Sequence, residues 1–210
     1  MKKRILSTLA IFSLIFATNL LTACDDDDDN DETTGNINGY EYVDLGLSVK
    51  WATVNIGATL PADYGNYYAW GETETKDKYT EDNSVTYGDS SFGDISGNAT
   101  YDAATANWGK KWRMPTRSEF EELLDDCTWT FTTQENSDGE EINGYLVEGT
   151  NGNFIFLPDD CSYWSSTPYT SSSAYYLFIR SIQDYPYQHF VDNDSSLKRY
   201  EGLNIRPVSD

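Results

Sequence analysis

The sequence contains one histidine, three cysteines and few basic residues, and each shortage excludes a class of function. Because protein zinc and iron sites draw on several imidazole, thiolate or carboxylate ligands, the single His189 leaves no histidine-rich metal site. Fourteen Lys and Arg against 35 Asp and Glu give a formal net charge of −21. Such a surface repels phosphate backbones, so we expect no nucleic-acid partner. We also expect no metal and no cofactor.

Motifs of catalysis are missing as well. The chain has no Gly-x-Ser-x-Gly elbow and no glycine-rich phosphate loop. Asp192-Asn193-Asp194 could offer oxygen ligands to calcium, but it lacks the glycine and the terminal glutamate of an EF-hand loop. We interpret it as a solvated turn and His189 as a partly exposed strand residue. The sequence therefore predicts a protein that is not an enzyme.

The longest apolar run lies at the N-terminus and ends at a cysteine. Lys2, Lys3 and Arg4 form a positive head, and residues 5–21 are apolar apart from a few Ser, Thr and Asn. This layout is that of a secretory signal. The alternative is a transmembrane anchor, since a span needs about 17 to 25 residues, although the polar residues dilute the run.

Leu21-Thr22-Ala23-Cys24 resembles a bacterial lipobox, which implies that residues 1–23 are a lipoprotein signal peptide and that Cys24 carries lipid. The membrane is then a partner through the N-terminal lipid only. The aspartates that follow resemble the acidic export signal of Bacteroidetes surface lipoproteins, which implies an outer-membrane, lipid-anchored protein facing the cell exterior. The alternative is a solvated spacer. These aspartates are Asp25, Asp26, Asp27, Asp28 and Asp29.

The remaining chain divides into an acidic flexible stalk, residues 24–38, and one domain, residues 39–210. The domain is long enough to bury a substantial core, and its six Trp indicate a folded chain. Besides Cys24, the only cysteines are Cys127 and Cys161. In an oxidising compartment they pair as a disulfide or stay as two separate buried thiols, and the sequence leaves both open.

Local patterns predict an α+β domain with two helices early and a β-rich C-terminal half of short antiparallel strands and long loops. Thr116 and Glu119 form a capping box that starts one helix, and a shorter helix is expected over residues 102–108. Asn151-Gly152 predicts a type I′ hairpin turn. A long surface loop is expected over residues 72–100. Strands are expected over residues 40–47, 49–54, 64–71, 163–166, 174–179, 187–191 and 203–208.

Six ordered blocks carry a resemblance to a known family. They read "DLGLSVKWATVNIGA", "YYAWGET", "ATANWGKKWRMPTRSEFEELL", "TNGNFIFLP", "YWSST" and "NIRPV". Together they resemble the Fibrobacter major paralogous domain, a family of Bacteroidetes lipoproteins, over residues 44–208. That family is similar to the formylglycine-generating-enzyme branch of C-type-lectin-like folds, whose helix start matches Trp112 to Thr116 and Glu119 here.

The resemblance implies a C-type-lectin-like fold, whereas the chemistry of that branch does not carry over. Its sulfatase-activating members use a closely spaced cysteine pair, but Cys127 and Cys161 lie far apart in the sequence. Its iron-binding members use several histidines, but this chain has only His189. The Glu-Pro-Asn and Trp-Asn-Asp tripeptides of calcium-dependent lectins are missing too.

Tyrosines interleaved with Ser, Asp and Asn mark the C-terminal third as the expected binding region. Tyrosine combines a large contact area with a polar tip, and paratopes are enriched in it. The alternative is that alternate aromatic residues fill the core. We expect ligand contacts from residues 175–200, above all from Tyr185, Tyr187, His189, Asp192 and Asn193.

Two classes of function remain. The first is a recognition or adhesion module for a glycan or protein ligand. The second is a structural or accessory subunit of a surface appendage or lipoprotein complex. Exposed aromatic side chains scattered among polar residues favour the first class, and one contiguous apolar patch favours the second.

Overall fold

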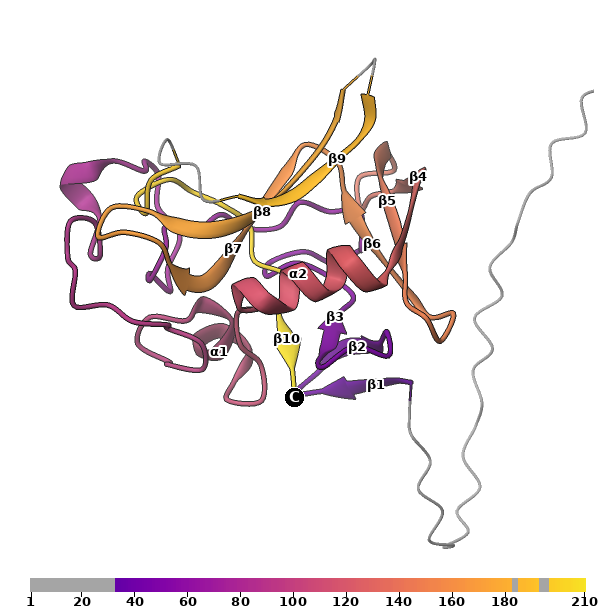
Figure 1. The fold of residues 1–210 in the computed structure, drawn as a ribbon, viewed down its shortest axis with the longest axis horizontal. Coiled ribbons are helices and arrows are strands. Elements are labelled where there is room, and N and C mark those ends of the chain that lie inside the picture. Colours follow the sequence, from indigo (N-terminus) through magenta and orange to yellow (C-terminus); the bar gives the residue numbers. More distant parts are fainter. Residues whose placement is uncertain (1–32, 183–184, 193–196) are drawn as a thin grey trace, which may run out of the picture. The chain divides into compact units, whose positions relative to one another are not determined.

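Three antiparallel sheets and two helices make up the structure, a computed structural model that describes residues 33–182, 185–192 and 197–210 (Figure 1). Within residues 181–192 the description covers the backbone alone. The expected mixed α+β class is confirmed: most strands are short and antiparallel, and both helices precede the β-rich second half of the chain.

The first sheet joins segments from both ends of the described chain. Its strand order is β1-β2-β3-β10, with β1 at Thr34–Ile37, β2 at Tyr40–Asp44, β3 at Lys50–Ala52 and β10 at Val208–Ser209. Ile37 pairs with Tyr40 across Asn38-Gly39, whose φ angles of 55° and 92° are those of a type I′ turn.

This sheet corrects one expected boundary. Residues 34–37 were assigned to the flexible stalk, yet they form β1 and pair with β2 along its whole length. The indole Nε1 of Trp112 also donates to the carbonyl of Ile37 at 3.0 Å, and Asn38 Nδ2 donates to the carbonyl of Trp108 at 2.9 Å. The folded unit therefore begins before residue 39.

Both helices begin at the capping residues that the sequence predicts. Helix α1, Ala103–Trp108, starts at Asp102, whose side chain accepts from Thr105 N, and ends at Gly109 with φ 93°. Helix α2, Arg117–Asp126, starts with the expected capping box, in which Thr116 and Glu119 each accept the other's backbone N–H. The expected loop over residues 72–100 is confirmed, apart from the 3-10 turn η1 at Glu81–Asn83.

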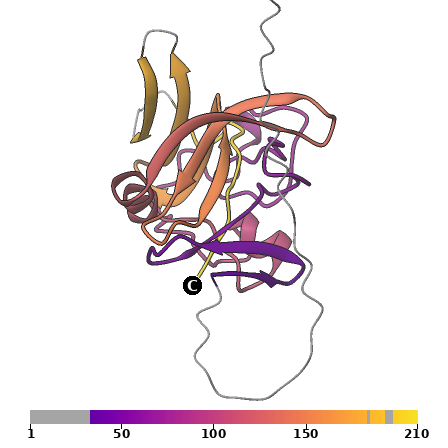
Figure 2. The same ribbon diagram turned by 90° about the vertical axis from the view of Figure 1, so that its right-hand side faces the viewer.

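The other two sheets follow α2 in the chain. One contains β4, Thr128–Glu135, β5, Glu141–Glu148, and β6, Phe154–Pro158. The other contains β7, Cys161–Pro168, β8, Ala174–Ile182, and β9, Tyr185–Asp192. The ends of β8 and β9 nearest residues 183–184 extend away from the other two sheets (Figures 1 and 2).

The hairpin between β5 and β6 forms, but the expected type I′ turn at Asn151-Gly152 is wrong. Glu148 pairs with Phe154, which leaves a longer loop, and of the two turn residues only Gly152 has a positive φ. Tertiary bonds explain the difference. The side-chain amides of Asn151 and Asn153 donate to the carbonyl of Asp44 at 3.0 and 2.9 Å, which fixes the loop against the first sheet.

Two other expected strands are not regular strands. Residues 64–71 contain an isolated bridge from Tyr68 to Leu203 in place of a strand, and of residues 203–208 only Val208 belongs to a strand, β10. Side chains replace a strand ladder here: the amide of Asn204 donates to the carbonyls of Tyr64 and Asn66 at 2.6 and 3.3 Å. A distant amide therefore satisfies backbone groups that a neighbouring strand would otherwise pair.

Aromatic residues fill the core, as the tryptophan content predicts. Five of the six Trp are buried. Phe120 and Leu123 of α2 pack with residues of all three sheets, among them Trp51, Tyr145 and Leu177. Helix α2 consequently packs against all three sheets through one shared core (Figure 1).

Two buried arginines, Arg206 and Arg199, hold separate segments together. Among the described residues neither forms an ion pair; both donate to backbone carbonyls instead. Arg206 is fully buried and donates to Asn55 Oδ1 at 2.8 Å and to the carbonyls of Ala52, Thr53 and Phe156 at 3.1, 2.7 and 3.1 Å. Burial lowers the pKa of Arg206 from its ordinary value.

Arg199 is buried in the same way. It donates to the carbonyls of Ser173, Thr86 and Asp89 at 3.3, 3.2 and 3.1 Å and to that of Thr170 at 2.5 Å. Its guanidinium also lies 4.2 Å from the centre of the Trp70 ring. Burial lowers the pKa of Arg199 to about 10, so the group remains charged at neutral pH.

Candidate functional site

The expected ligand-binding residues map to the last strand of the third sheet. Tyr185, Tyr187, His189 and Asp192 lie on β9, while Asn193 lies outside the described residues. The sheet order β7-β8-β9 makes β9 an edge strand, which explains how it accommodates Pro186. The strand expected over residues 187–191 forms as part of β9, which pairs with β8, with His189 opposite Ile179.

The N-terminal features predicted from the sequence lie outside the described residues. They are the signal peptide, Cys24 and Asp25 to Asp29. Within residues 33–182, 185–192 and 197–210, no helix has the length and hydropathy needed to cross a bilayer.

The two cysteines of the domain are free thiols, which is one of the two alternatives left open by the sequence. Cys161 is buried, and its thiol donates to Asn204 Oδ1 at 3.0 Å. Burial raises the pKa of Cys161 to about 12. Burial, followed by the charges of Asp126 and Glu122, raises the pKa of Cys127 to about 11. At neutral pH neither is a thiolate, so neither is suited to nucleophilic chemistry.

An exposed aromatic group does lie in the expected C-terminal region, beside the start of α2. Tyr169, in the loop between β7 and β8, has 44 % of its surface exposed. Its ring meets that of Tyr175 edge to face, with centroids 5.3 Å apart. The guanidinium carbon of Arg117 lies 4.4 Å from the centre of the Tyr175 ring, and Nη1 donates to the Tyr175 hydroxyl at 3.1 Å. We call Arg117, Tyr169 and Tyr175 the tyrosine–arginine cluster.

The helix fixes the arginine of this cluster. Arg117 is the first residue of α2, and its backbone N–H donates to Thr167 Oγ1 at 3.1 Å. One turn further on, Glu121 accepts from the Arg117 guanidinium at 2.7 Å. Thr167 Oγ1 in turn donates to Asp94 Oδ2 at 2.8 Å, which places a carboxylate and a hydroxyl at the border of the cluster.

Hydrogen bonds within the β7–β8 loop fix the position of Tyr169. The backbone N–H of Tyr169 donates to the carbonyl of Ser173 at 3.0 Å, and the hydroxyls of Thr170 and Ser173 are hydrogen-bonded at 2.7 Å. Arg199 also donates to the carbonyl of Thr170. Tyr169 is therefore exposed on a loop that is itself well bonded, so little conformational freedom is lost on binding.

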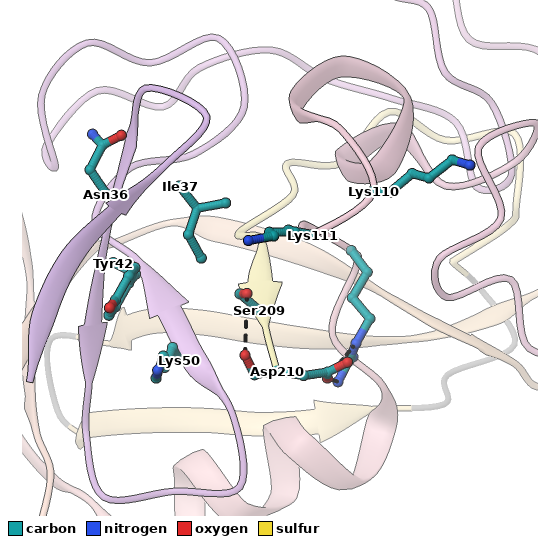
Figure 3. A pocket seen from close by; sticks show the side chains of 9 residues that line it. Asn36, Ile37, Tyr42, Lys50, Lys110, Lys111, Ser209 and Asp210 are labelled. Atoms are coloured by element: carbon teal, nitrogen blue, oxygen red, sulfur yellow. Dashed lines mark hydrogen bonds and ion pairs between the residues drawn. The ribbon is translucent and has the colours of Figure 1, made fainter. Parts of the chain in front are cut away.

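A second feature is a hollow of about 510 Å³ beside the first sheet (Figure 3). We call it the basic hollow. It lies between β1, β2, β3 and β10 and the segment that joins α1 to α2. Its lining residues are Asn36, Ile37, Tyr42, Lys50, Lys110, Lys111, Arg113, Ser209 and Asp210.

Four of these lining residues are cationic, and one is acidic. Arg113 is neutralised by Glu119 at 2.6 Å and by Asp210 at 2.6 Å, and the bonds to Glu119 are the first cause that raises the pKa of Arg113. The ammonium of Lys50 lies 5.0 Å from the centre of the Tyr42 ring. Figure 3 shows Lys50 beside Tyr42 and Lys111 reaching toward Ile37, while Lys110 points away from the centre.

The sequence indicates each of these two features only in part. Lys110-Lys111 is a doublet of basic residues in a chain with few of them, which was a signal for the basic hollow. Tyr175 lies in the expected range, but no local pattern shows that Arg117 contacts it.

Across the described part of the chain, no three His, Cys, Asp or Glu side chains come close enough together to hold a metal ion.

The chain matches none of the protein-family models, curated proteins or solved structures with which it was compared. Its resemblance to the Fibrobacter major paralogous domain therefore stays a prediction.

Proposed function

We propose that the protein is a non-enzymatic surface lipoprotein with a C-type-lectin-like fold that recognises a glycan or protein ligand through its C-terminal strands and loops. The observation that supports this proposal best is the exposed Tyr169, held against Tyr175 and Arg117 by the contacts above. The expected contacts, Tyr185, Tyr187, His189 and Asp192, lie on β9 of the same sheet.

The chemistry of the tyrosine–arginine cluster suits recognition. Tyr and Arg are enriched among the residues that dominate binding energy, because they combine a large contact area with directed hydrogen bonds. The face of a tyrosine ring can cover the apolar face of a sugar or a peptide side chain. Neighbouring Glu121 and Asp94 supply acceptors for hydroxyl or amide donors.

The distribution of exposed apolar residues favours recognition over the alternative of an assembly subunit. Among the described residues, the exposed large apolar side chains are Leu60, Tyr64, Tyr67, Val85, Phe131, Phe154 and Tyr169. Phe131 pairs with Tyr145 and Phe154 pairs with Glu148, so these two phenylalanines lie on opposite faces of their sheet. Leu60, Tyr64 and Tyr67 share one irregular segment, but the two phenylalanines lie on different faces, so the exposed apolar residues do not form the single contiguous patch expected of an assembly surface.

Replacing Tyr169 with Ala tests the proposed site. On an array of glycans and extracellular proteins probed with the full chain in mild detergent, we expect wild-type binding to at least one class. The variant should lose about 1 to 2 kcal/mol of that affinity while its melting temperature stays near wild type, because the side chain is largely exposed. Tyr67→Ala, which removes a ring of similar exposure on another loop, is the matched control. Equal losses for both variants would contradict the assignment.

The proposed location is tested at Cys24 and at Asp25 to Asp29. Cys24→Ser should move the protein from the membrane to the soluble fraction, because the acyl chains that anchor it are lost. Replacing the five aspartates with Ala should keep the lipid but protect the protein from protease added to intact cells. If that variant is cleaved as readily as wild type, the aspartates are a spacer and not an export signal.

A further inference from the structure

The basic hollow stands out against the charge of the whole protein. The chain carries a formal net charge of −21, so most of its surface repels anions. Within the described residues, Lys50, Lys110 and Lys111 form no ion pair, whereas Arg113 in the same lining is paired with Glu119 and Asp210. Two lysines without an ion pair, Lys50 and Lys111, thus line one hollow of an acidic protein, and Lys110 lies at its rim.

The hollow also holds groups that can bind neutral parts of a ligand. Asn36 offers an amide and Ser209 a hydroxyl, while Ile37 contributes an apolar wall. Ser209 donates only a long bond of 3.5 Å to the carbonyl of Asp210, so its hydroxyl is available to a better partner. The mixture of cations, hydrogen-bonding groups and a small apolar surface matches a sugar that bears negative charges.

We propose that the basic hollow binds a short acidic saccharide that carries sulfate or carboxylate groups. Lys50 and Lys111 bind the anionic groups, Lys110 adds a cation at the rim, and Asn36 and Ser209 bind hydroxyls. This site is separate from the tyrosine–arginine cluster, and it rests on different residues and a different observation.

The surroundings of the hollow favour a narrow ligand. A broad anionic surface that approached the protein would meet its many carboxylates as well as the three lysines. A short saccharide enters the hollow, where the one lining carboxylate, Asp210, is already paired with Arg113. Screening by salt limits the repulsion from more distant carboxylates to about 10 Å at ~0.1 M ionic strength.

Binding of short oligosaccharides of dextran sulfate, of an oligogalacturonate and of neutral dextran oligosaccharides of the same length to the full chain in mild detergent tests this proposal. We expect the two acidic saccharides to bind and neutral dextran not to bind. Affinity should fall severalfold as ionic strength rises from about 0.1 to about 1 M, because the screening length shortens from about 10 to about 3 Å and the attraction by the lysines is screened in turn. The double variant Lys50→Ala, Lys111→Ala should bind at least about tenfold more weakly, while Lys111→Arg keeps the charge and most of the affinity.

Lys78→Ala is the matched control, because Lys78 is an exposed lysine outside the hollow. It should bind like wild type, and the melting temperatures of all variants should confirm that they are folded. Equal binding of dextran and dextran sulfate would overturn the proposal. So would an unchanged affinity of the double variant, or an equal loss in Lys78→Ala, which would show that only the total charge matters.

Discussion

Replacing Arg206 with Met is expected to lower the free energy of unfolding by about 3 to 5 kcal/mol. The guanidinium is fully buried and donates to the Asn55 side chain and to three backbone carbonyls. Met fills much of the volume but donates nothing, so these acceptors lose their partner in a place that water does not reach. Each buried unsatisfied group costs about 1 to 3 kcal/mol.

Thermal unfolding followed by circular dichroism measures this effect. Because natural domains are stable by about 5 to 15 kcal/mol, the expected loss is a large fraction of the total, and the melting temperature should fall by roughly 10 °C or more. Arg180→Met is the control: its side chain is 58 % exposed and lies 3.8 Å from Asp160, so its loss should change stability by less than about 0.5 kcal/mol. Similar melting temperatures for both variants would show that Arg206 is dispensable to the fold.

Replacing Arg199 with Met is expected to cost about 2 to 4 kcal/mol and to loosen two loops selectively. Arg199 joins Thr86 and Asp89 of the long loop to Thr170 and Ser173 of the β7–β8 loop. Its removal leaves four carbonyls without this donor and also removes the cation from the Trp70 ring. Tyr169 adjoins the loosened segment, so the same change should weaken ligand binding at the proposed site.

Hydrogen exchange measured by mass spectrometry distinguishes this outcome from general destabilisation. Peptides covering residues 84–92 and 168–174 should exchange faster in Arg199→Met, whereas peptides of α2 should change much less. Arg199→Lys keeps a charge over Trp70 but offers one ammonium in place of the forked guanidinium, so it should fall between wild type and Met. A uniform rise in exchange across all peptides would contradict a specific role in holding these loops.

Local chemistry explains which parts of the fold the sequence predicts well. Both helices begin at the expected residues, because Asp102 and the Thr116–Glu119 pair satisfy free N–H groups within a few positions. The two Asn-Gly dipeptides show that the same local sequence can give different turns. Asn38-Gly39 forms the two-residue turn typical of the pair, whereas Asn151-Gly152 does not, because Asn151 bonds to Asp44 in a distant part of the chain.

The candidate sites likewise combine residues that a local pattern indicates with residues that only the tertiary fold brings together. Tyr175 lies in the region that composition marked for binding, since an interleaved run of tyrosine and small polar residues is visible in the sequence. Its partner Arg117 belongs to a helix 58 residues earlier, and no local pattern connects the two. The basic hollow draws on segments from both ends of the domain, including Asn36 and Ser209, so it exists only after the tertiary fold forms.

The position of β10 in the first sheet sets the order in which this chain can fold. Val208 pairs with Trp51, and its backbone also exchanges two hydrogen bonds with Arg113, at 3.0 and 2.9 Å. A chain that emerges N-terminus first, from a ribosome or a membrane pore, cannot complete this sheet until its residue 208 is free. Pairings across such sequence separations also form slowly. The first sheet is consequently completed only after the rest of the described chain has been synthesised.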